Sequence, residues 1–266
     1  MTGLPESLHL AIRVEGHDGP CVLWIHGYTI DSSLWRGLWD ALPGCRHLAV
    51  DLPGHGASPP LRAEETLATL GRRLARWAVA EGVRHVVGLS LGSTVALQVA
   101  IEAPDAFETL TLGAPAFGGG PVEGEVGRRY AELRHLHRDL GHGPWLADRW
   151  MVSPPDLFTA AKGKPLLWPD IARVVRRHRW EELPDFAIAR IATWPQPLAS
   201  IRRIRARGRI FIGSSEMPAF VETAFILESA LEQAEIVRLD DAGHLCMIET
   251  PLAAAETLRL DWGLCS

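Results

Sequence analysis

The chain lacks several features that would define a broad class of protein. None of its apolar stretches approaches the ~18 uninterrupted residues of a membrane-spanning helix, so we expect no membrane partner. The formal net charge is −5, which argues against a nucleic-acid partner. No Gly-x-Gly-x-x-Gly fingerprint or Walker loop is present, and Gly118–Gly120 lacks the strand and lysine of a phosphate-binding loop. The partner that we expect is a small-molecule substrate.

Cysteine and lysine are also scarce. The four cysteines, Cys21, Cys45, Cys246 and Cys265, show no close pairing, which predicts reduced thiols in a cytosolic protein. Residues 1–6 lack the basic and apolar regions of a secretion signal, so we expect a cytoplasmic location. The histidines show no metal-binding spacing, so we expect no metal and no other cofactor. Only two of the 27 basic residues are lysines, a skew typical of GC-rich bacterial genomes.

The strongest positive signal is the sequence Gly-Leu-Ser-Leu-Gly at residues 88–92. It follows the apolar run 85–87 and precedes the helix-like run 93–100, so the serine falls on a turn from strand to helix. Such a turn holds the hydroxyl of Ser90 away from the backbone, and the flanking glycines prevent clashes with the neighbouring strand and helix. The helix also directs its first N–H groups at the same point, where they can stabilise an oxyanion. We therefore interpret Ser90 as a nucleophile.

A serine hydroxyl needs a base at neutral pH, and His244 is the candidate. It lies on a loop between the apolar run 236–239 and Pro251, which indicates the start of a helix. Cys246 lies two residues away, but it has no comparable turn and is not our nucleophile.

The third group should be a carboxylate that orients the base. Residues 209–213 are typical of a buried strand, and Glu216 is the only acid in the loop that follows, so Glu216 is the candidate. Asp240 and Asp241 are alternatives. They lie only three or four residues before His244, which makes it awkward for either side chain to turn back under the ring.

Taken together, four blocks resemble those of an α/β-hydrolase, and the resemblance covers nearly the whole chain. They are residues 23–28 (Leu-Trp-Ile-His-Gly-Tyr), residues 51–58 (Asp-Leu-Pro-Gly-His-Gly-Ala-Ser), residues 88–92 and residues 242–244 (Ala-Gly-His). The resemblance implies that the backbone N–H groups of Tyr28 and Leu91 form the oxyanion hole. It also implies structural roles for His26 and His55. The acid loop usually reads Gly-x-x-Asp in this family and has Glu216 here.

The same pattern predicts the fold class, an α/β protein with a mostly parallel central sheet and helices on both faces. Strand-like runs, beginning with Leu8–Val14, alternate with helical stretches such as Glu64–Glu81. The alternation stops near Ala114 and resumes near Arg209. We therefore expect a hydrolase core at 1–114 and 201–266, with an inserted helical cap at 115–200.

The cap is expected to contain helices at Gly127–Leu140, Trp145–Val152 and Asp170–Glu182. It holds five tryptophans, which either pack the cap onto the core or form walls of an apolar pocket. Its helices also carry eight arginines, at 128, 129, 134, 138, 173, 176, 177 and 179. Such a run usually forms a solvated face, but one arginine could hold a substrate carboxylate or phosphate.

These observations predict a serine hydrolase that acts on a small carboxylic ester, thioester or lactone through Ser90, His244 and Glu216. One alternative is a carbon–carbon bond hydrolase, or a proton-abstracting lyase of the menaquinone-pathway type, acting on an anionic substrate. Another is a ligand-binding protein of low turnover on the same fold. The oligomeric state is not predicted by any of these features.

Overall fold

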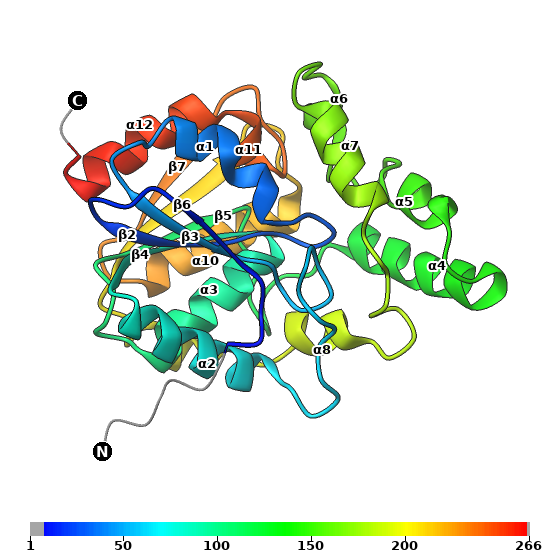
Figure 1. The fold of residues 1–266 in the computed structure, drawn as a ribbon, viewed down its shortest axis with the longest axis horizontal. Coiled ribbons are helices and arrows are strands. Elements are labelled where there is room, and N and C mark those ends of the chain that lie inside the picture. Colours follow the sequence, from blue (N-terminus) through cyan, green and yellow to red (C-terminus); the bar gives the residue numbers. More distant parts are fainter. Residues whose placement is uncertain (1–7, 265–266) are drawn as a thin grey trace.

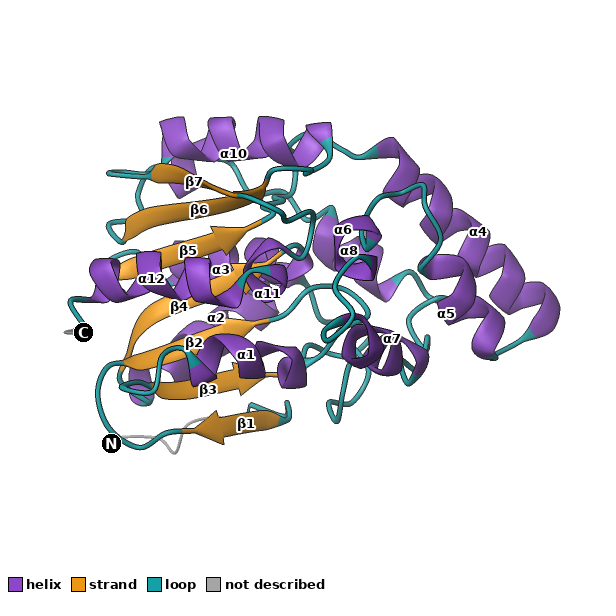
Figure 2. Cartoon of the chain, turned by 90° about the horizontal axis from the view of Figure 1, so that it is seen from above, coloured by secondary structure: helices purple, strands orange, loops and turns teal. Residues whose placement is uncertain are grey.

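The structure is a computed structural model that describes residues 8–264. Seven strands form one sheet: β1 (Ile12–Glu15), β2 (Cys21–Ile25), β3 (Arg46–Val50), β4 (Val83–Leu89), β5 (Thr109–Gly113), β6 (Arg207–Gly213) and β7 (Glu235–Leu239). Their order is β1-β3-β2-β4-β5-β6-β7 (Figure 2). β1 runs antiparallel to β3, and all other neighbours are parallel. The predicted α/β fold with a mostly parallel sheet is confirmed.

The composition of the strands explains their place in the sheet. Every residue of β2 and β5 is buried, as expected of apolar strands that helices cover on both faces. The edge strand β1 is mostly exposed. The strand expected from Leu8 begins only at Ile12, because His9 adopts a left-handed backbone (φ 52°) and Ala11 bonds to Asp51 and Ser58 in the loop after β3.

Two layers of helices cover the sheet (Figure 1). One contains α2 (Leu67–Ala80), α3 (Leu91–Glu102) and α10 (Pro218–Ala230). The other contains α1 (Arg36–Asp40), which follows the short 3-10 helix Ser32–Trp35, together with α11 (Cys246–Glu249) and α12 (Pro251–Trp262). α2 buries Leu67, Leu70 and Leu74 along one stripe, at the spacing of an amphipathic helix. Within residues 8–264, no helix is both long and apolar enough to cross a bilayer.

Between β5 and β6 the chain forms a helical insertion, which we define as residues 114–206. Its helices are α4 (Gly124–Leu140), α5 (Pro144–Trp150), α6 (Thr159–Lys162), α7 (Trp168–Arg176), α8 (Ala187–Ala192) and α9 (Leu198–Ile201). Figures 1 and 2 place α4 to α7 beyond the carboxyl ends of the parallel strands. In parallel α/β sheets this is the end at which ligands bind.

One predicted helix of the insertion is too long. The helix expected over Asp170–Glu182 ends at Arg176, as α7. Trp180 has a left-handed backbone (φ 58°), which a continuing α-helix does not allow. The chain turns here, and it buries His178, Trp180 and Glu182 instead of displaying them on a solvated helix.

Candidate active site

Ser90 lies on the turn between β4 and α3, as the sequence predicts. Its backbone angles are φ 55° and ψ −120°, a strained conformation for a residue other than glycine. A Cβ added to Gly92 would lie 2.1 Å from the carbonyl oxygen of Ile25. A Cβ added to Gly88 would lie 2.3 Å from the carbonyl oxygen of Gly92. The two glycines therefore allow α3 to pack directly against β2 and β4, and this packing holds the strained turn in place.

Three polar side chains from three loops form a hydrogen-bonded series. His244 Nε2 lies 2.8 Å from Ser90 Oγ, and His244 Nδ1 lies 3.0 Å from Glu216 Oε1. Glu216 Oε1 also accepts the Met217 N–H at 2.9 Å. The His244 and Glu216 side chains are almost fully buried, and the Phe220 ring packs on the imidazole at 4.4 Å. This arrangement orients the imidazole toward Ser90 Oγ.

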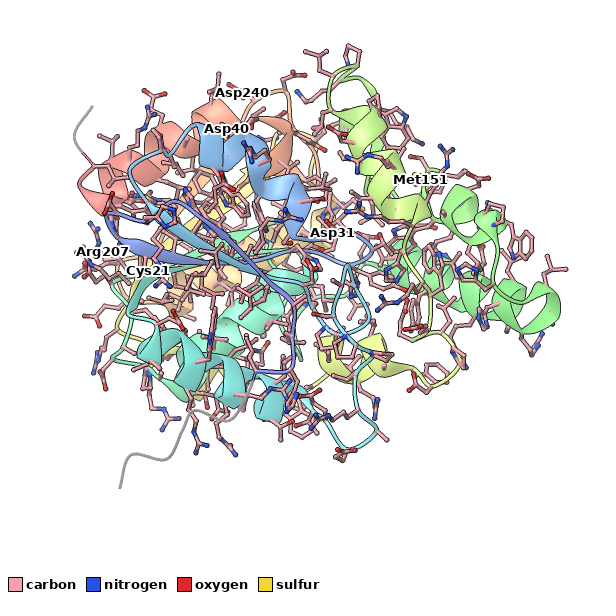
Figure 3. The ribbon with its side chains drawn as sticks, in the orientation of Figure 1. Cys21, Asp31, Asp40, Met151, Arg207 and Asp240 are labelled. Carbon is pink, nitrogen blue, oxygen red and sulfur yellow. The ribbon has the colours of Figure 1, made fainter. Side chains whose placement is uncertain are left out.

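The two alternative acids point elsewhere. Asp240 and Asp241 are exposed, and Figure 3 shows Asp240 on the outer surface near α11 and α12. The Asp241 side chain is 94 % exposed and pairs with Lys164 at 2.8 Å. The structure therefore brings Glu216, and neither aspartate, to His244.

Tyr28 and Leu91 frame the other side of Ser90. Leu91 is the first residue of α3, where helix geometry leaves the backbone N–H without a partner. A Cβ on Gly27 would lie 3.3 Å from Ser90 Cβ, so the loop carrying Tyr28 passes directly beside the serine. Neither the Tyr28 N–H nor the Leu91 N–H has an acceptor within the part of the chain that the structure describes. Both donors are available to a negatively charged oxygen.

His26 holds this loop from behind. Its Nδ1 donates to the Gly27 carbonyl at 2.8 Å, and its Nε2 accepts the Leu52 N–H at 2.9 Å. Both ring nitrogens are thus engaged, and burial lowers the pKa of His26, so the ring stays neutral. These contacts are structural, as the resemblance implies for this residue.

The phenol of Tyr28 forms a contact that the sequence did not reveal. Its hydroxyl donates to Glu182 at 2.5 Å, and His178 Nε2 lies 3.0 Å from the same carboxylate oxygen. Burial and the neighbouring Glu182 raise the pKa of Tyr28 well above its usual range. Burial alone would raise the pKa of Glu182, but the hydrogen bonds from His178 and Tyr28 outweigh it, so the pKa is lowered. The loop after β2 is therefore bonded to a carboxylate of the insertion.

His55 completes this buried polar cluster. Its ring lies 5.2 Å from that of His26 and 4.6 Å from that of His178, and its Nδ1 donates to the Pro53 carbonyl. Burial depresses the pKa of His55, so the rings can pack without mutual repulsion. Although three histidines meet here, no group of three or more potential ligands among residues 8–264 is arranged to hold a metal ion.

The eight arginines that the sequence singled out all have partners within the protein, although Arg177 and Arg179 lie beyond the end of α7 at Arg176. Arg177 bonds to Asp31, which Figure 3 places at the end of the sheet facing the insertion, and Arg179 bonds to the Gly56 and Ser58 carbonyls. Arg129 is buried against three backbone carbonyls, and Arg134 bonds to the Leu183 carbonyl. The others pair with acidic side chains: Arg128–Glu125, Arg138–Asp139, Arg173–Asp170 and Arg176–Asp148. Arg128, Arg138 and Arg173 pair with exposed neighbours in sequence, whereas the other five arginines join segments that are distant in sequence.

Cys246, close to His244 in sequence, is fully buried, with its Sγ 3.7 Å from the Phe211 carbonyl. Burial and the nearby carboxylates raise the pKa of its thiol well above its usual range, which makes it a poor nucleophile. Cys21, Cys45 and Cys246 are all free thiols.

Comparison with known proteins agrees with this architecture. A family model described as the alpha/beta hydrolase family matches residues 22–257. A pimeloyl-[acyl-carrier protein] methyl ester esterase from Methylococcus capsulatus is 42% identical over 118 residues, which is 42% of this chain and 44% of that protein. A 2-succinyl-6-hydroxy-2,4-cyclohexadiene-1-carboxylate synthase from Salmonella paratyphi C is 30% identical over 148 residues, 54% of each chain. The match spans about half or less of each of these relatives.

Among solved structures, the enol-lactonase from Burkholderia xenovorans superimposes with a TM-score of 0.76. It is 23% identical, and the match covers 95% of each chain, so the likeness concerns the fold. The family match covers most of the sequence, and the chain belongs to the alpha/beta hydrolase family.

Proposed function

We propose that the chain is a serine hydrolase that cleaves a small carboxylic ester, thioester or lactone through an acyl-enzyme. The supporting observation is the series Ser90 Oγ–His244 Nε2 at 2.8 Å and His244 Nδ1–Glu216 Oε1 at 3.0 Å. A nucleophile, a base within hydrogen-bond reach and a carboxylate that orients the base are the three parts this chemistry requires.

The proposed reaction begins when His244 Nε2 removes the proton of Ser90 as Oγ attacks the carbonyl carbon. Glu216 holds the Nδ1 proton and stabilises the imidazolium that forms. The tetrahedral intermediate collapses, and His244 passes its proton to the leaving oxygen or sulfur. Water, deprotonated by His244, then attacks the acyl-enzyme and releases the acid, which regenerates Ser90.

The backbone N–H groups of Tyr28 and Leu91 are the proposed oxyanion donors. Both flank Ser90 and both lack an acceptor within residues 8–264. In serine hydrolases the loss of one such donor costs about 3–4 kcal/mol of transition-state stabilisation.

The proposed domain organisation follows the predicted boundaries, with a core at 1–114 and 201–266 and a cap at 115–200. The position of α4 to α7 beyond the strand ends supports such a cap, as do the contacts of the Tyr28 ring with Tyr130 of α4 and Trp150 of α5. The free thiols of Cys21, Cys45 and Cys246 are consistent with the proposed cytoplasmic location.

An uncharged ester fits the insertion better than an anionic substrate does. The alternative reading, a lyase or carbon–carbon bond hydrolase, draws on the similarity to the Salmonella synthase and would use an unpaired cation to hold a carboxylate. The eight arginines that the sequence singled out instead bond to acidic side chains, backbone carbonyls or both.

The test is intact-mass analysis after incubation with a fluorophosphonate, followed by hydrolysis of p-nitrophenyl acetate. Wild type and Ser229→Ala, whose hydroxyl bonds only within α10, should gain one adduct and hydrolyse the ester. Ser90→Ala should do neither. A folded wild type that gains no adduct, or a Ser90→Ala protein that keeps wild-type turnover, would overturn the proposal. An adduct without steady-state hydrolysis would instead identify a ligand-binding protein of low turnover.

A further inference from the structure

A second buried carboxylate, that of Glu249 in α11, lies against the loop that carries His244. Its side chain is only 5 % exposed, yet it lies outside the series formed by Ser90, His244 and Glu216. Its Oε2 accepts the backbone N–H of Gly243, the residue directly before His244. We propose that Glu249 is a positioning residue for His244, which orients its loop and supplies a second negative charge near the imidazole. This inference rests on the proposed hydrolase function.

The peptide unit between Ala242 and Gly243 is held at both of its ends. Its carbonyl accepts the Ser215 N–H at 2.9 Å, from the loop that follows β6. Its N–H donates to Glu249. Because a peptide unit is planar, hydrogen bonds at both ends fix its orientation, and this sets the direction in which the chain continues to the Cα of His244. Glu249 therefore acts on the base through a single backbone group.

Glycine at position 243 gives these two hydrogen bonds their importance. A Cβ there would lie 3.0 Å from Ala160 Cβ in α6, so close packing of the insertion favours a residue without a side chain. Glycine, however, allows many backbone orientations, so its own conformational preference does not fix the peptide before His244. The hydrogen bond to Glu249 supplies the restraint that glycine lacks.

A buried carboxylate is a costly group for a contact that a neutral side chain could also make. Burial raises the pKa of Glu249, and the Gly243 N–H and the charges of His244 and Lys164 oppose this effect without cancelling it. Its Oε1 has no hydrogen-bond partner within residues 8–264. A charged oxygen buried in this way lowers stability. The benefit of a carboxylate at this position is therefore its negative charge near the base.

Two carboxylates act on this part of the loop. Glu216 and Glu249 both help to raise the pKa of the Cys246 thiol, after burial, which is the largest cause. The cation that acts on Glu249, Lys164, is itself paired with the exposed Asp241 at 2.8 Å. Glu216 and Glu249 thus both favour the protonated imidazole, which is the form that the proposed attack on the carbonyl creates.

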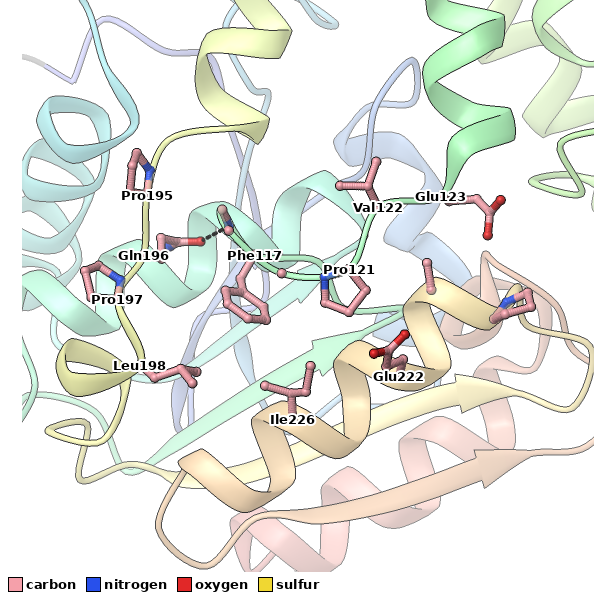
Figure 4. A pocket seen from close by; sticks show the side chains of 15 residues that line it. Phe117, Pro121, Val122, Glu123, Pro195, Gln196, Pro197, Leu198, Glu222 and Ile226 are labelled. Atoms are coloured by element: carbon pink, nitrogen blue, oxygen red, sulfur yellow. Dashed lines mark hydrogen bonds between the residues drawn. The ribbon is translucent and has the colours of Figure 1, made fainter.

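Glu249 lines neither of two hollows on the described part of the chain. One, of about 950 Å³, lies between the insertion and α10 and is formed by residues 117–123, residues 195–198 and one side of that helix (Figure 4). The other, of about 380 Å³, lies beside Asp31 and Arg177. Because Glu249 is buried behind the backbone of the loop, its substitution should change kcat and leave KM nearly unaltered.

Three variants test the proposal in the hydrolysis of p-nitrophenyl acetate. Glu249→Ala removes both the acceptor and the charge and should lower kcat roughly 10²-fold, the loss expected when a reacting group is slightly misplaced. Glu249→Gln keeps an acceptor for the Gly243 N–H and should lower kcat less. Its lost charge should move the acid limb of the kcat/KM profile to lower pH by about half a unit or more. Glu256→Gln, at an exposed position on α12, should change neither quantity.

Thermal unfolding establishes that each variant is folded at the assay temperature, and Glu249→Gln keeps the test available if Glu249→Ala does not fold. A folded Glu249→Gln protein whose acid limb matches that of wild type would overturn the proposal. So would a folded Glu249→Ala protein with the kcat of wild type.

An NMR titration separates this role from the hydrolase function. The ring signals of isotopically labelled histidine, assigned with His244→Gln, report the pH at which His244 takes up a proton, without any turnover. This pH should be lower in Glu249→Gln than in wild type or Glu256→Gln. If it falls while wild type gains no fluorophosphonate adduct, the role of Glu249 stands and the serine chemistry fails. If the adduct forms but the titration is unchanged, the chemistry stands and the proposal for Glu249 fails.

Discussion

The Tyr28 hydroxyl donates a 2.5 Å hydrogen bond to Glu182, which joins the loop after β2 to a turn in the helical insertion. Tyr28 is also the residue whose backbone N–H we assign to the oxyanion hole. The bond therefore connects the position of a proposed catalytic donor to the docking of the insertion. Glu182 is almost inaccessible to solvent in this buried cluster. A hydrogen bond to a charged group contributes more to stability there than it would on the surface.

Replacing Tyr28 by Phe should destabilise the protein by about 1–3 kcal/mol, because buried Glu182 loses a hydrogen-bond donor. The measurement is the free energy of unfolding in urea. Tyr130→Phe is the matched control: the Tyr130 ring lies 6.0 Å from that of Tyr28, but its buried hydroxyl has no partner within residues 8–264. Equal losses in the two variants would contradict the importance of the Tyr28–Glu182 bond.

Replacing Glu216 by Gln should lower kcat by roughly 10³–10⁴-fold, since an amide cannot stabilise the His244 imidazolium and favours the wrong tautomer. Steady-state hydrolysis of p-nitrophenyl acetate measures the change. Asp241→Asn provides the comparison, because Asp241 is exposed and bonds to Lys164. Its kcat should stay close to wild type, and a comparable loss in Asp241→Asn would mean that the wrong acid has been assigned.

Gly92→Ala should cost about 1–3 kcal/mol of stability and most of the esterase activity, because the new Cβ would meet the Ile25 carbonyl oxygen at 2.1 Å. Thermal unfolding and fluorophosphonate labelling report the two effects. Gly127→Ala, in α4, makes the same change where no atom lies within 4 Å. It should stabilise the protein by up to about 1 kcal/mol through helix propensity. A Gly92→Ala protein with unchanged stability and labelling would show that the turn tolerates side chains.

Stability should fall as the pH drops from 6.5 toward 4. Burial lowers the pKa values of His47 and His85 from 6.5 to about 4, so the unfolded chain binds protons in this window and the folded chain does not. The stabilisation is complete above pH 6.5, and its loss at pH 5.5 should be roughly 1 kcal/mol for each residue. Urea unfolding at pH 7.5 and 5.5 measures the difference. His85→Gln should reduce it, whereas His17→Gln, at an exposed position, should not.

The parts of the site that could be predicted from the sequence are those marked by a short motif directly after a strand. The turn at Ser90, the His-Gly loop and the loops of Glu216 and His244 each follow a strand, and strands of a parallel sheet end at one edge. Glu182 and His178 had no such signal, since their partner Tyr28 lies about 150 residues earlier. The turn at Trp180 was missed because helical periodicity continues through it, while the backbone does not.

The hydrogen bonds between Gly118 and Gln196 bring the two ends of most of the insertion to neighbouring points beside α3, where Gln196 also donates to the Thr94 carbonyl. A segment whose ends lie close together can be replaced by another segment while the strands on either side keep their positions. The ends of the insertion are thus suitable sites for replacing it with the insertion of another protein of this fold. Chimaeras joined at residues 118 and 196 should keep the core intact while they acquire the substrate range of the donor.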